Sequence, residues 1–197
     1  MSWPLCPVEL AGRTVTLAPL SSAHAAALSE AVRDGELWRL WYTSVPSPQE
    51  MHSEIERRLA LQASGSMLPF TVLDDSGTPV GMTTYMNVDA VHRRVEIGST
   101  WYARRVQRSP LNTECKRLLL AHAFDALQCI AVEFRTHRFN MQSRRAIERL
   151  GAQLDGVLRA HQRSRDGSLR DTAVYSITAA EWPAVKMNLQ WQLERPR

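Results

Sequence analysis

The chain has 197 residues, of which 44% are hydrophobic and 22% charged, with a net charge of +4. This length predicts one domain over residues 1–197, and a globule of this size buries roughly 70% of its unfolded surface without metals or disulfides. The sequence has no apolar run of the ~20 residues that are needed to cross a bilayer, and its start lacks the pattern of a signal peptide. Its cysteines are too few and too scattered to form a framework of disulfides. We therefore expect a cytoplasmic protein without a membrane partner.

Much of the basic charge lies in one segment. Residues 91–150 carry twelve Lys or Arg against five Asp or Glu, whereas the rest of the chain carries twelve against fifteen. Nearly all of these cations are arginines, whose planar guanidinium matches phosphate oxygens. The segment is either a solvated arginine-rich surface or a binding site for a polyanion, with nucleic acid and a phosphate-bearing small molecule as the two candidates.

The first half of the chain predicts two helices and an antiparallel meander. Alternating residues predict a first strand, a serine cap opens a helix, and Met51, Ile55 and Leu59 lie four apart on one face of a second helix. Runs rich in β-branched and aromatic residues, separated by turn residues, then predict three strands. The expected elements are a strand at 13–17, a helix from Ser21, a helix from about Met51, and strands at 70–73, 81–86 and 93–102.

The second half alternates strands with helices. Leu120, Ala123, Phe124 and Leu127 mark an amphipathic helix from about Leu111 to Gln128. A strand at 132–137, a helix capped by Asn140 and ended by Gly151, a late strand at 174–177 after the Asp166-Gly167 turn, and a helix from Glu181 follow. The order β-α-α-β-β-β-α-β-α-β-β-α predicts an α/β (α+β) fold: a mixed, mostly antiparallel sheet with one strand–helix–strand crossover.

The crossover contains a candidate anion site. Trp101 and Tyr102 end a strand, the loop that follows carries Arg104, Arg105 and Arg108, and Ser109-Pro110 is typical of a helix cap followed by the first helical residue. Free N–H groups and the helix dipole favour a phosphate at such a terminus. Many helices nevertheless begin near arginines without binding anything.

A second motif follows about thirty residues later: Asn140-Met141-Gln142-Ser143, then a helix that ends at Leu150-Gly151. Strand, phosphate loop, helix, strand and Asn-x-x-Ser together resemble the GNAT superfamily of acetyl-CoA-dependent N-acetyltransferases, in particular its ribosomal-protein N-terminal acetyltransferase-like branch. The motif region spans about Glu96 to His161. The resemblance implies a single acetyltransferase domain with a splayed sheet flanked by helices.

The resemblance also implies a cofactor site for acetyl-CoA. The pantetheine arm is expected between the strand that ends at Tyr102 and the strand that ends at His137, with the diphosphate on residues 107–113. The implied cofactor-binding residues are Thr100, Trp101, Tyr102, Gln107, Arg108, Ser109, Pro110, Leu111, Asn112, Thr113, Asn140 and Ser143. The family's Gln-Gly-x-Gly-x loop is replaced by Gln107-Arg108-Ser109-Pro110-Leu111, where Pro110 has no N–H to donate. Cofactor binding then depends on Arg108 and Ser109, or is weakened.

The resemblance implies direct acetyl transfer to a primary amine, which must be neutral to attack the thioester. Glu96 is the candidate base, or else it pairs with Arg94 or an arginine of a neighbouring strand. Ser143 is the candidate hydrogen-bond donor to the leaving thiolate, or else a first-turn serine that satisfies backbone N–H groups. Tyr175 is a second candidate donor, although a late-strand tyrosine more often serves packing.

The acceptor is expected to be a small-molecule amine, an amino acid or a peptide N-terminus. Trp38, Trp41 and Tyr42 stand beside a Ser/Pro-rich bend and are the candidate substrate-binding residues, although core packing accounts for at least one tryptophan. A homodimer is expected because the branch often pairs. Two alternatives stay open: a degenerate member that binds CoA without turnover, and an arginine-rich nucleic-acid-binding module. No metal is expected, because Cys115 and His122 are seven residues, about 10.5 Å, apart on one helix.

Overall fold

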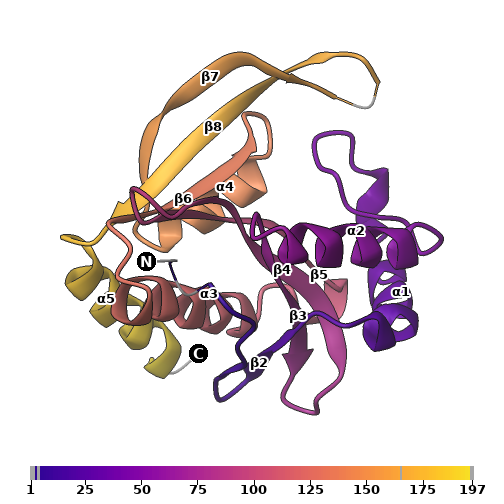
Figure 1. Cartoon of the computed structure of the whole chain (residues 1–197), viewed down its shortest axis with the longest axis horizontal. Coiled ribbons are helices and arrows are strands. Elements are labelled where there is room, and N and C mark those ends of the chain that lie inside the picture. The colour runs from indigo at the N-terminus through magenta and orange to yellow at the C-terminus, as the bar shows by residue number, and fades with distance from the viewer. Residues whose placement is uncertain (1–2, 4, 165, 196–197) are drawn as a thin grey trace.

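The computed structural model describes Trp3, residues 5–164 and residues 166–195; Met1, Ser2 and Pro4, which belong to the N-terminal stretch considered above, lie outside this range. Within it, an eight-stranded sheet has the order β1-β2-β3-β4-β5-β6-β8-β7 (Figure 1). The strands are β1 (Leu10–Ala11), β2 (Val15–Pro19), β3 (Leu68–Asp74), β4 (Pro79–Asp89), β5 (Arg94–Tyr102), β6 (Ala131–His137), β7 (Gln153–Arg163) and β8 (Leu169–Thr178). Of these neighbours only β5 and β6 are parallel, which confirms the mixed, mostly antiparallel sheet.

The helices follow the predicted order. They are α1 (Ala25–Arg33), α2 (Met51–Ala63), α3 (Leu111–Ala121), α4 (Met141–Arg149) and α5 (Trp182–Glu194), with 3₁₀ turns at Ser22–His24, Leu37–Arg39 and Arg104–Val106. The two-residue strand β1 was not predicted, because two residues are too few for a period-2 pattern. The helix expected to reach Gln128 changes to a π-turn at His122–Ala126, where the Leu127 N–H donates to the His122 carbonyl at 2.9 Å.

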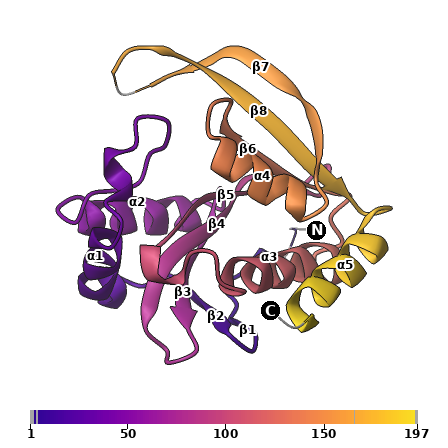
Figure 2. The same cartoon turned by 180° about the vertical axis from the view of Figure 1, so that it is seen from behind.

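Helices cover both faces of the sheet. Neighbouring strand residues point to opposite faces, and on β3 the side chain of Phe70 packs in the cluster that contains Leu119 of α3, whereas Thr71 hydrogen-bonds His24 at the start of α1. The α3 side forms the larger core and extends to α5, while α1 and α2 cover a smaller cluster that contains Met82. Figure 2 shows α3 and α5 lying side by side, away from α1 and α2.

The sheet opens at the crossover. The parallel pairing of β5 with β6 runs only from Arg94 opposite Ala131 to Glu96 opposite Glu133. Beyond this point β5 continues to Tyr102 beside β4 alone, and β6 continues to His137 beside β8 alone. The two strands therefore separate over their C-terminal halves, and the predicted splay is confirmed.

The β7–β8 hairpin extends past the end of β6 and arches toward the segment between α1 and α2 (Figure 1). Most residues of β7 are exposed, because this strand is an edge of the sheet. The hairpin thus covers the open end of the splayed strands. Among the described residues, no helix combines the length and the apolar character needed to cross a bilayer.

Candidate active site

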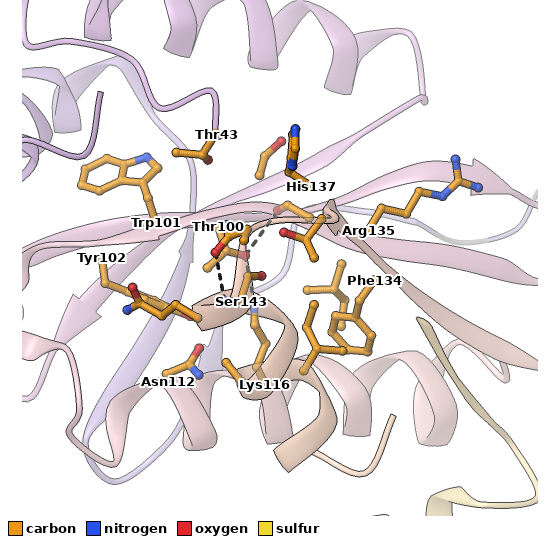
Figure 3. Close-up of a pocket in the computed structure, with 18 of the residues that line it drawn as sticks. Thr43, Thr100, Trp101, Tyr102, Asn112, Lys116, Phe134, Arg135, His137 and Ser143 are labelled. Atoms are coloured by element: carbon orange, nitrogen blue, oxygen red, sulfur yellow. Dashed lines mark hydrogen bonds between the residues drawn. The ribbon is translucent and has the colours of Figure 1, made fainter. Parts of the chain in front are cut away.

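A cavity of about 930 Å³ lies where β5 and β6 separate (Figure 3). Its lining comes from both splayed strands, the loop before α3, the first turns of α3 and α4, and the hairpin. Twelve of the predicted site residues line it: Tyr42, Glu96, Thr100, Trp101, Tyr102, Gln107, Arg108, Ser109, Asn112, Thr113, Asn140 and Ser143. Four others, Trp38, Trp41, Pro110 and Leu111, are not among the lining residues. Segments far apart in the sequence thus converge on one cavity.

The loop before α3 is held by its own side chains. The Gln107 amide donates to the Tyr102 carbonyl at 2.9 Å, and the Ser109 hydroxyl donates to the Val106 carbonyl at 2.6 Å while it accepts from the Leu111 N–H at 3.3 Å. The α-helix begins at Leu111, as its periodicity predicted, and Pro110, expected as the first helical residue, is the N-cap. The Leu111 N–H is taken by Ser109, but the N–H groups of Asn112 and Thr113 have no acceptor within the helix, so they are available to an anion.

Arg108 and Pro110 occupy the positions where the resemblance expects glycines. Arg108 has a φ of 60°, a left-handed conformation that glycine adopts without strain, whereas Pro110 has an ordinary φ of −60°. Arg108 is exposed and lines the cavity, but Arg105 pairs with Asp34 at 3.6 Å outside it. Of the three loop arginines, Arg108 is therefore the one placed to meet a phosphate group in the cavity.

Glu96 is a buried carboxylate in the wall of the cavity. It accepts a hydrogen bond from the Asn87 amide at 2.7 Å and lies 3.5 Å from Nε of Arg135, on the neighbouring strand β6. Arg94 pairs instead with Glu133. Burial raises the pKa of Glu96 above its ordinary value, and the contacts with Asn87 and Arg135 offset this only in part. A carboxyl group with a raised pKa, open to a cavity, is suited to accept a proton.

Ser143 and Asn140 lie at the start of α4. The Asn140 side chain accepts from the Ser143 N–H at 3.0 Å, as the predicted helix cap requires. The Ser143 hydroxyl lines the cavity and has no hydrogen-bond partner among the described residues.

Tyr175, the second candidate donor, is fully buried and does not line the cavity. Its hydroxyl donates to Glu148 at 2.7 Å and accepts from Arg144 at 2.8 Å. Its position is therefore that of a packed core residue.

A buried amine, which the sequence analysis missed, is among the residues that line the cavity. Lys116 of α3 donates to the Thr100 hydroxyl at 2.9 Å and to the Thr83 hydroxyl at 3.2 Å, and Figure 3 shows it rising from the helix toward Thr100. Burial lowers the pKa of Lys116. A signal was present, because Lys116 precedes Leu120 by four residues and so shares the buried face of the helix.

The wall formed by β6, β7 and β8 is basic. Arg135, His137, His161 and Arg170 all line the cavity there. Arg135 is neutralised by Glu133 at 2.9 Å and by Glu96, whereas the guanidinium of Arg170 has no hydrogen bond or ion pair with a described residue. The alternation of residues in a strand identifies which side chains share a face of the sheet. It does not show that a hairpin folds over a distant site, so the contribution of β7 and β8 to the cavity was not predicted.

The aromatic residues of the bend are divided between core and surface. Trp38 packs partly buried against the α1–α2 cluster, whereas Trp41 is 60% exposed and contacts the rings of His137 and Phe139, with centroids 5.0 and 6.3 Å away. Tyr42 lines the cavity and contacts Trp41 edge-on.

In the part of the chain that the structure describes, no group of three or more His, Cys, Asp or Glu side chains could hold a metal.

Comparison with known proteins gives consistent matches. Over 115 residues the chain is 30% identical to the Bacillus subtilis (strain 168) protein "Putative ribosomal N-acetyltransferase YdaF", and this match spans 56% of the chain and 59% of that relative. The crystal structure of a GCN5-related N-acetyltransferase from Brucella melitensis is 31% identical with a TM-score of 0.85, covering 95% of this chain and 86% of that one. Mycobacterium smegmatis RimJ in complex with CoA-disulfide is 25% identical with a TM-score of 0.79, covering 96% and 95%.

The family model of the acetyltransferase (GNAT) domain matches residues 14–153, from just before β2 through α4 to the first residue of β7. This range contains the splayed strands, the helix N-terminus and the Asn-x-x-Ser motif that build the cavity. The chain therefore belongs to the GNAT acetyltransferase family.

Proposed function

We propose that the protein transfers the acetyl group of acetyl-CoA to a primary amine by direct attack. The observation that carries this proposal is the gap between β5 and β6, which continues to the first turn of α3 and to Arg108. An extended, amide-containing arm with a phosphate end matches both parts of this cavity, because unpaired strand groups bind amides and a helix N-terminus binds phosphate.

The cavity offers donors that suit such a ligand. The indole N–H of Trp101 is buried without an acceptor, and the first-turn N–H groups of α3 and the Arg108 guanidinium face no acidic partner among the described residues. A buried donor without an acceptor is costly, so a ligand that supplies oxygens is favoured. The residues proposed to bind acetyl-CoA are Thr100, Trp101, Tyr102, Gln107, Arg108, Ser109, Pro110, Leu111, Asn112, Thr113, Asn140 and Ser143, with Pro110 and Leu111 acting by positioning the start of α3.

The proposed mechanism assigns proton transfers to two residues. Glu96, directly or through a water, removes a proton from the acceptor ammonium, and the neutral amine attacks the thioester carbonyl carbon. The C–N bond forms as the C–S bond breaks, and the departing thiolate receives the second amine proton while Ser143 donates a hydrogen bond to it. Acetyl-CoA supplies the activated acyl group, and Arg135 keeps Glu96 oriented toward the cavity.

The acceptor is proposed to be a small-molecule amine, an amino acid or a peptide N-terminus that enters past Trp41 and Tyr42. The name of YdaF favours a protein or peptide for that relative. The proposal includes a cytoplasmic homodimer, and Trp191, 60% exposed on α5, supports a surface for self-association.

Two assays test the proposal. At a hundredfold excess over its dissociation constant, acetyl-CoA should add about 2.7 kcal/mol to the unfolding free energy and raise the melting temperature. A thiol-release assay over a panel of amines should then show turnover. Stabilisation without turnover of any amine would indicate the degenerate CoA-binding alternative, and stabilisation by duplex DNA alone would contradict the enzyme.

A further inference from the structure

The basic wall of the cavity contains one cation that nothing in the described protein neutralises. Arg170 lies on β8 opposite Gln162, at the part of the hairpin that extends past the end of β6. Its side chain lines the cavity, and its Nε–H is buried without an acceptor. Burying a charged N–H donor without a partner costs free energy that an anionic ligand would recover.

The neighbouring carboxylate does not meet this need. Glu96 is the one acidic residue among the described lining residues, and Asn87 and Arg135 both contact its Oε2. Burial lowers the pKa of Arg170 and the charge of Glu96 offsets this only in part, and Glu96 and Arg170 form no ion pair. Arg170 therefore lies within electrostatic range of the proposed base and keeps its hydrogen-bonding edge free.

The surroundings of Arg170 favour an anion as well. His137 and His161 line the same wall, and Arg170 contributes to the lowered pKa of His137, after burial. The phosphate-binding features of the cavity, Arg108 and the first turn of α3, belong to the other strand of the gap, beyond the end of β5. The cavity thus has two places for negative charge, and only one of them suits the diphosphate of the donor.

We propose that the acceptor carries a carboxylate close to its amine and that Arg170 binds this carboxylate while Glu96 faces the amine. A guanidinium forms two parallel, charge-assisted hydrogen bonds with a carboxylate, which fix orientation as well as affinity. The carboxylate can be the α-carboxylate of a free amino acid or an acidic side chain next to a peptide amino terminus. This inference rests on the proposed function, because it deepens the acceptor class of the same site.

The test uses matched acceptors that differ only in the carboxylate. One pair is a free amino acid and its carboxamide; the other is an amidated tripeptide with Asp or Asn at its second position. The wild-type protein should acetylate the carboxylated member of at least one pair with the lower KM, and the pair that shows this preference identifies the source of the carboxylate. Binding of the corresponding N-acetylated products, measured by calorimetry with CoA present, gives a readout that does not need turnover.

Substitution of Arg170 separates recognition from a general effect on Glu96. Arg170→Gln should raise KM for the carboxylated acceptor by about ten- to a hundredfold and leave the neutral acceptor within about twofold. Arg170→Lys should recover part of the loss, because it keeps the charge without the two-pronged geometry. Arg163→Gln, an exposed arginine of the same hairpin that does not line the cavity, is the matched control and should change neither acceptor.

Three results would overturn the inference. The first is an equal KM for the two members of each pair, and the second is that no carboxylated member is acetylated and no carboxylated product binds. The third is an equal rise in KM for the carboxylated and the neutral acceptor in Arg170→Gln. Stabilisation by acetyl-CoA is measured on every variant. If it persists while the acceptor preference is missing, the inference fails alone; if it is missing in the wild type, the proposed function fails.

Discussion

Glu114, in the first turn of α3, binds the hydroxyl and the backbone N–H of Thr14 at 2.5 and 2.7 Å, and it also accepts from the Arg13 N–H at 2.8 Å. These bonds join the turn between β1 and β2 to the helix that presents its first-turn N–H groups to the cavity. A carboxylate with three donors is bound strongly, because each such hydrogen bond is charge-assisted. The contact makes the N-terminal strands part of the support of the site.

We expect Glu114→Gln to lower the unfolding free energy by about 2 kcal/mol. Burial opposes ionisation of Glu114, but the bonds from Thr14 and the two backbone N–H groups outweigh it, so its pKa lies below the ordinary value. The contribution of Glu114 to the unfolding free energy is therefore complete above pH ~4.5, the ordinary pKa of a glutamate, and decreases as the pH falls through the lower pKa of the folded state. Denaturant unfolding at pH 7 and pH 3 checks this: an identical difference between wild type and variant at both values would contradict it.

Glu96 should give the pH profile of kcat/KM an acidic limb. Because burial raises the pKa of Glu96, activity should fall with decreasing pH at a midpoint above the ordinary value of 4.5. Glu96→Gln should lose about a hundredfold or more in kcat and lack this limb, with an unchanged dissociation constant for acetyl-CoA. A variant with wild-type kcat would remove Glu96 from the mechanism.

Arg108 should combine conformational strain with a binding contribution. Arg108→Gly relieves a φ of 60°, which costs a non-glycine residue about 1 kcal/mol, so the unliganded variant should melt no lower than the wild type. The same variant should bind acetyl-CoA about tenfold more weakly, because it loses a cation at the anion site. Arg108→Ala keeps the strained φ without the charge and should show weaker binding with no gain in melting temperature. Equal binding by all three proteins would exclude a phosphate contact.

Lys116 should destabilise the fold at neutral pH. Its pKa is lowered by burial, so the folded state binds fewer protons than the unfolded state between the folded-state value and the ordinary 10.5, and stability rises with pH across that window. Lys116→Met removes the buried charge and leaves Thr83 and Thr100 bonded to each other at 2.8 Å. The variant should melt higher than the wild type at pH 7, with a smaller advantage at pH 10. A lower melting temperature at pH 7 would show that the two threonine contacts outweigh the cost of burial.

Substitutions of Ser143 and Asn140 should have different effects, the first on catalysis and the second on the stability of α4. Ser143→Ala should reduce kcat by about tenfold with an unchanged melting temperature, because its hydroxyl has no partner in the described protein. Asn140→Ala should instead lower the unfolding free energy by about 1 kcal/mol, because the Ser143 N–H loses its cap. Rapid-quench measurement of the acetyl-transfer step and thermal unfolding of both variants make the comparison. A melting temperature that falls in both would assign Ser143 to the structure of α4.

The sequence determined the helices and the crossover because their signals are local. Helical periodicity, the Asn140 cap and the Ser109-Pro110 pair depend on neighbours within a few residues, and the structure places each within a residue or two of its predicted position. Glu96 was proposed through the resemblance to the acetyltransferase family and not from a local structural pattern. Arg170 could not be found in this way, because its importance depends on the path of a hairpin and on the absence of a partner. Neither property exists until the whole sheet is assembled.

The excess of positive charge in residues 91–150 has a kinetic consequence, because this segment builds the donor side of the cavity while the rest of the chain is net negative. A polyanionic donor is attracted to this net positive segment, and such steering accelerates association by one or more orders of magnitude at low ionic strength. Added salt should therefore slow the arrival of acetyl-CoA much more than it slows its departure.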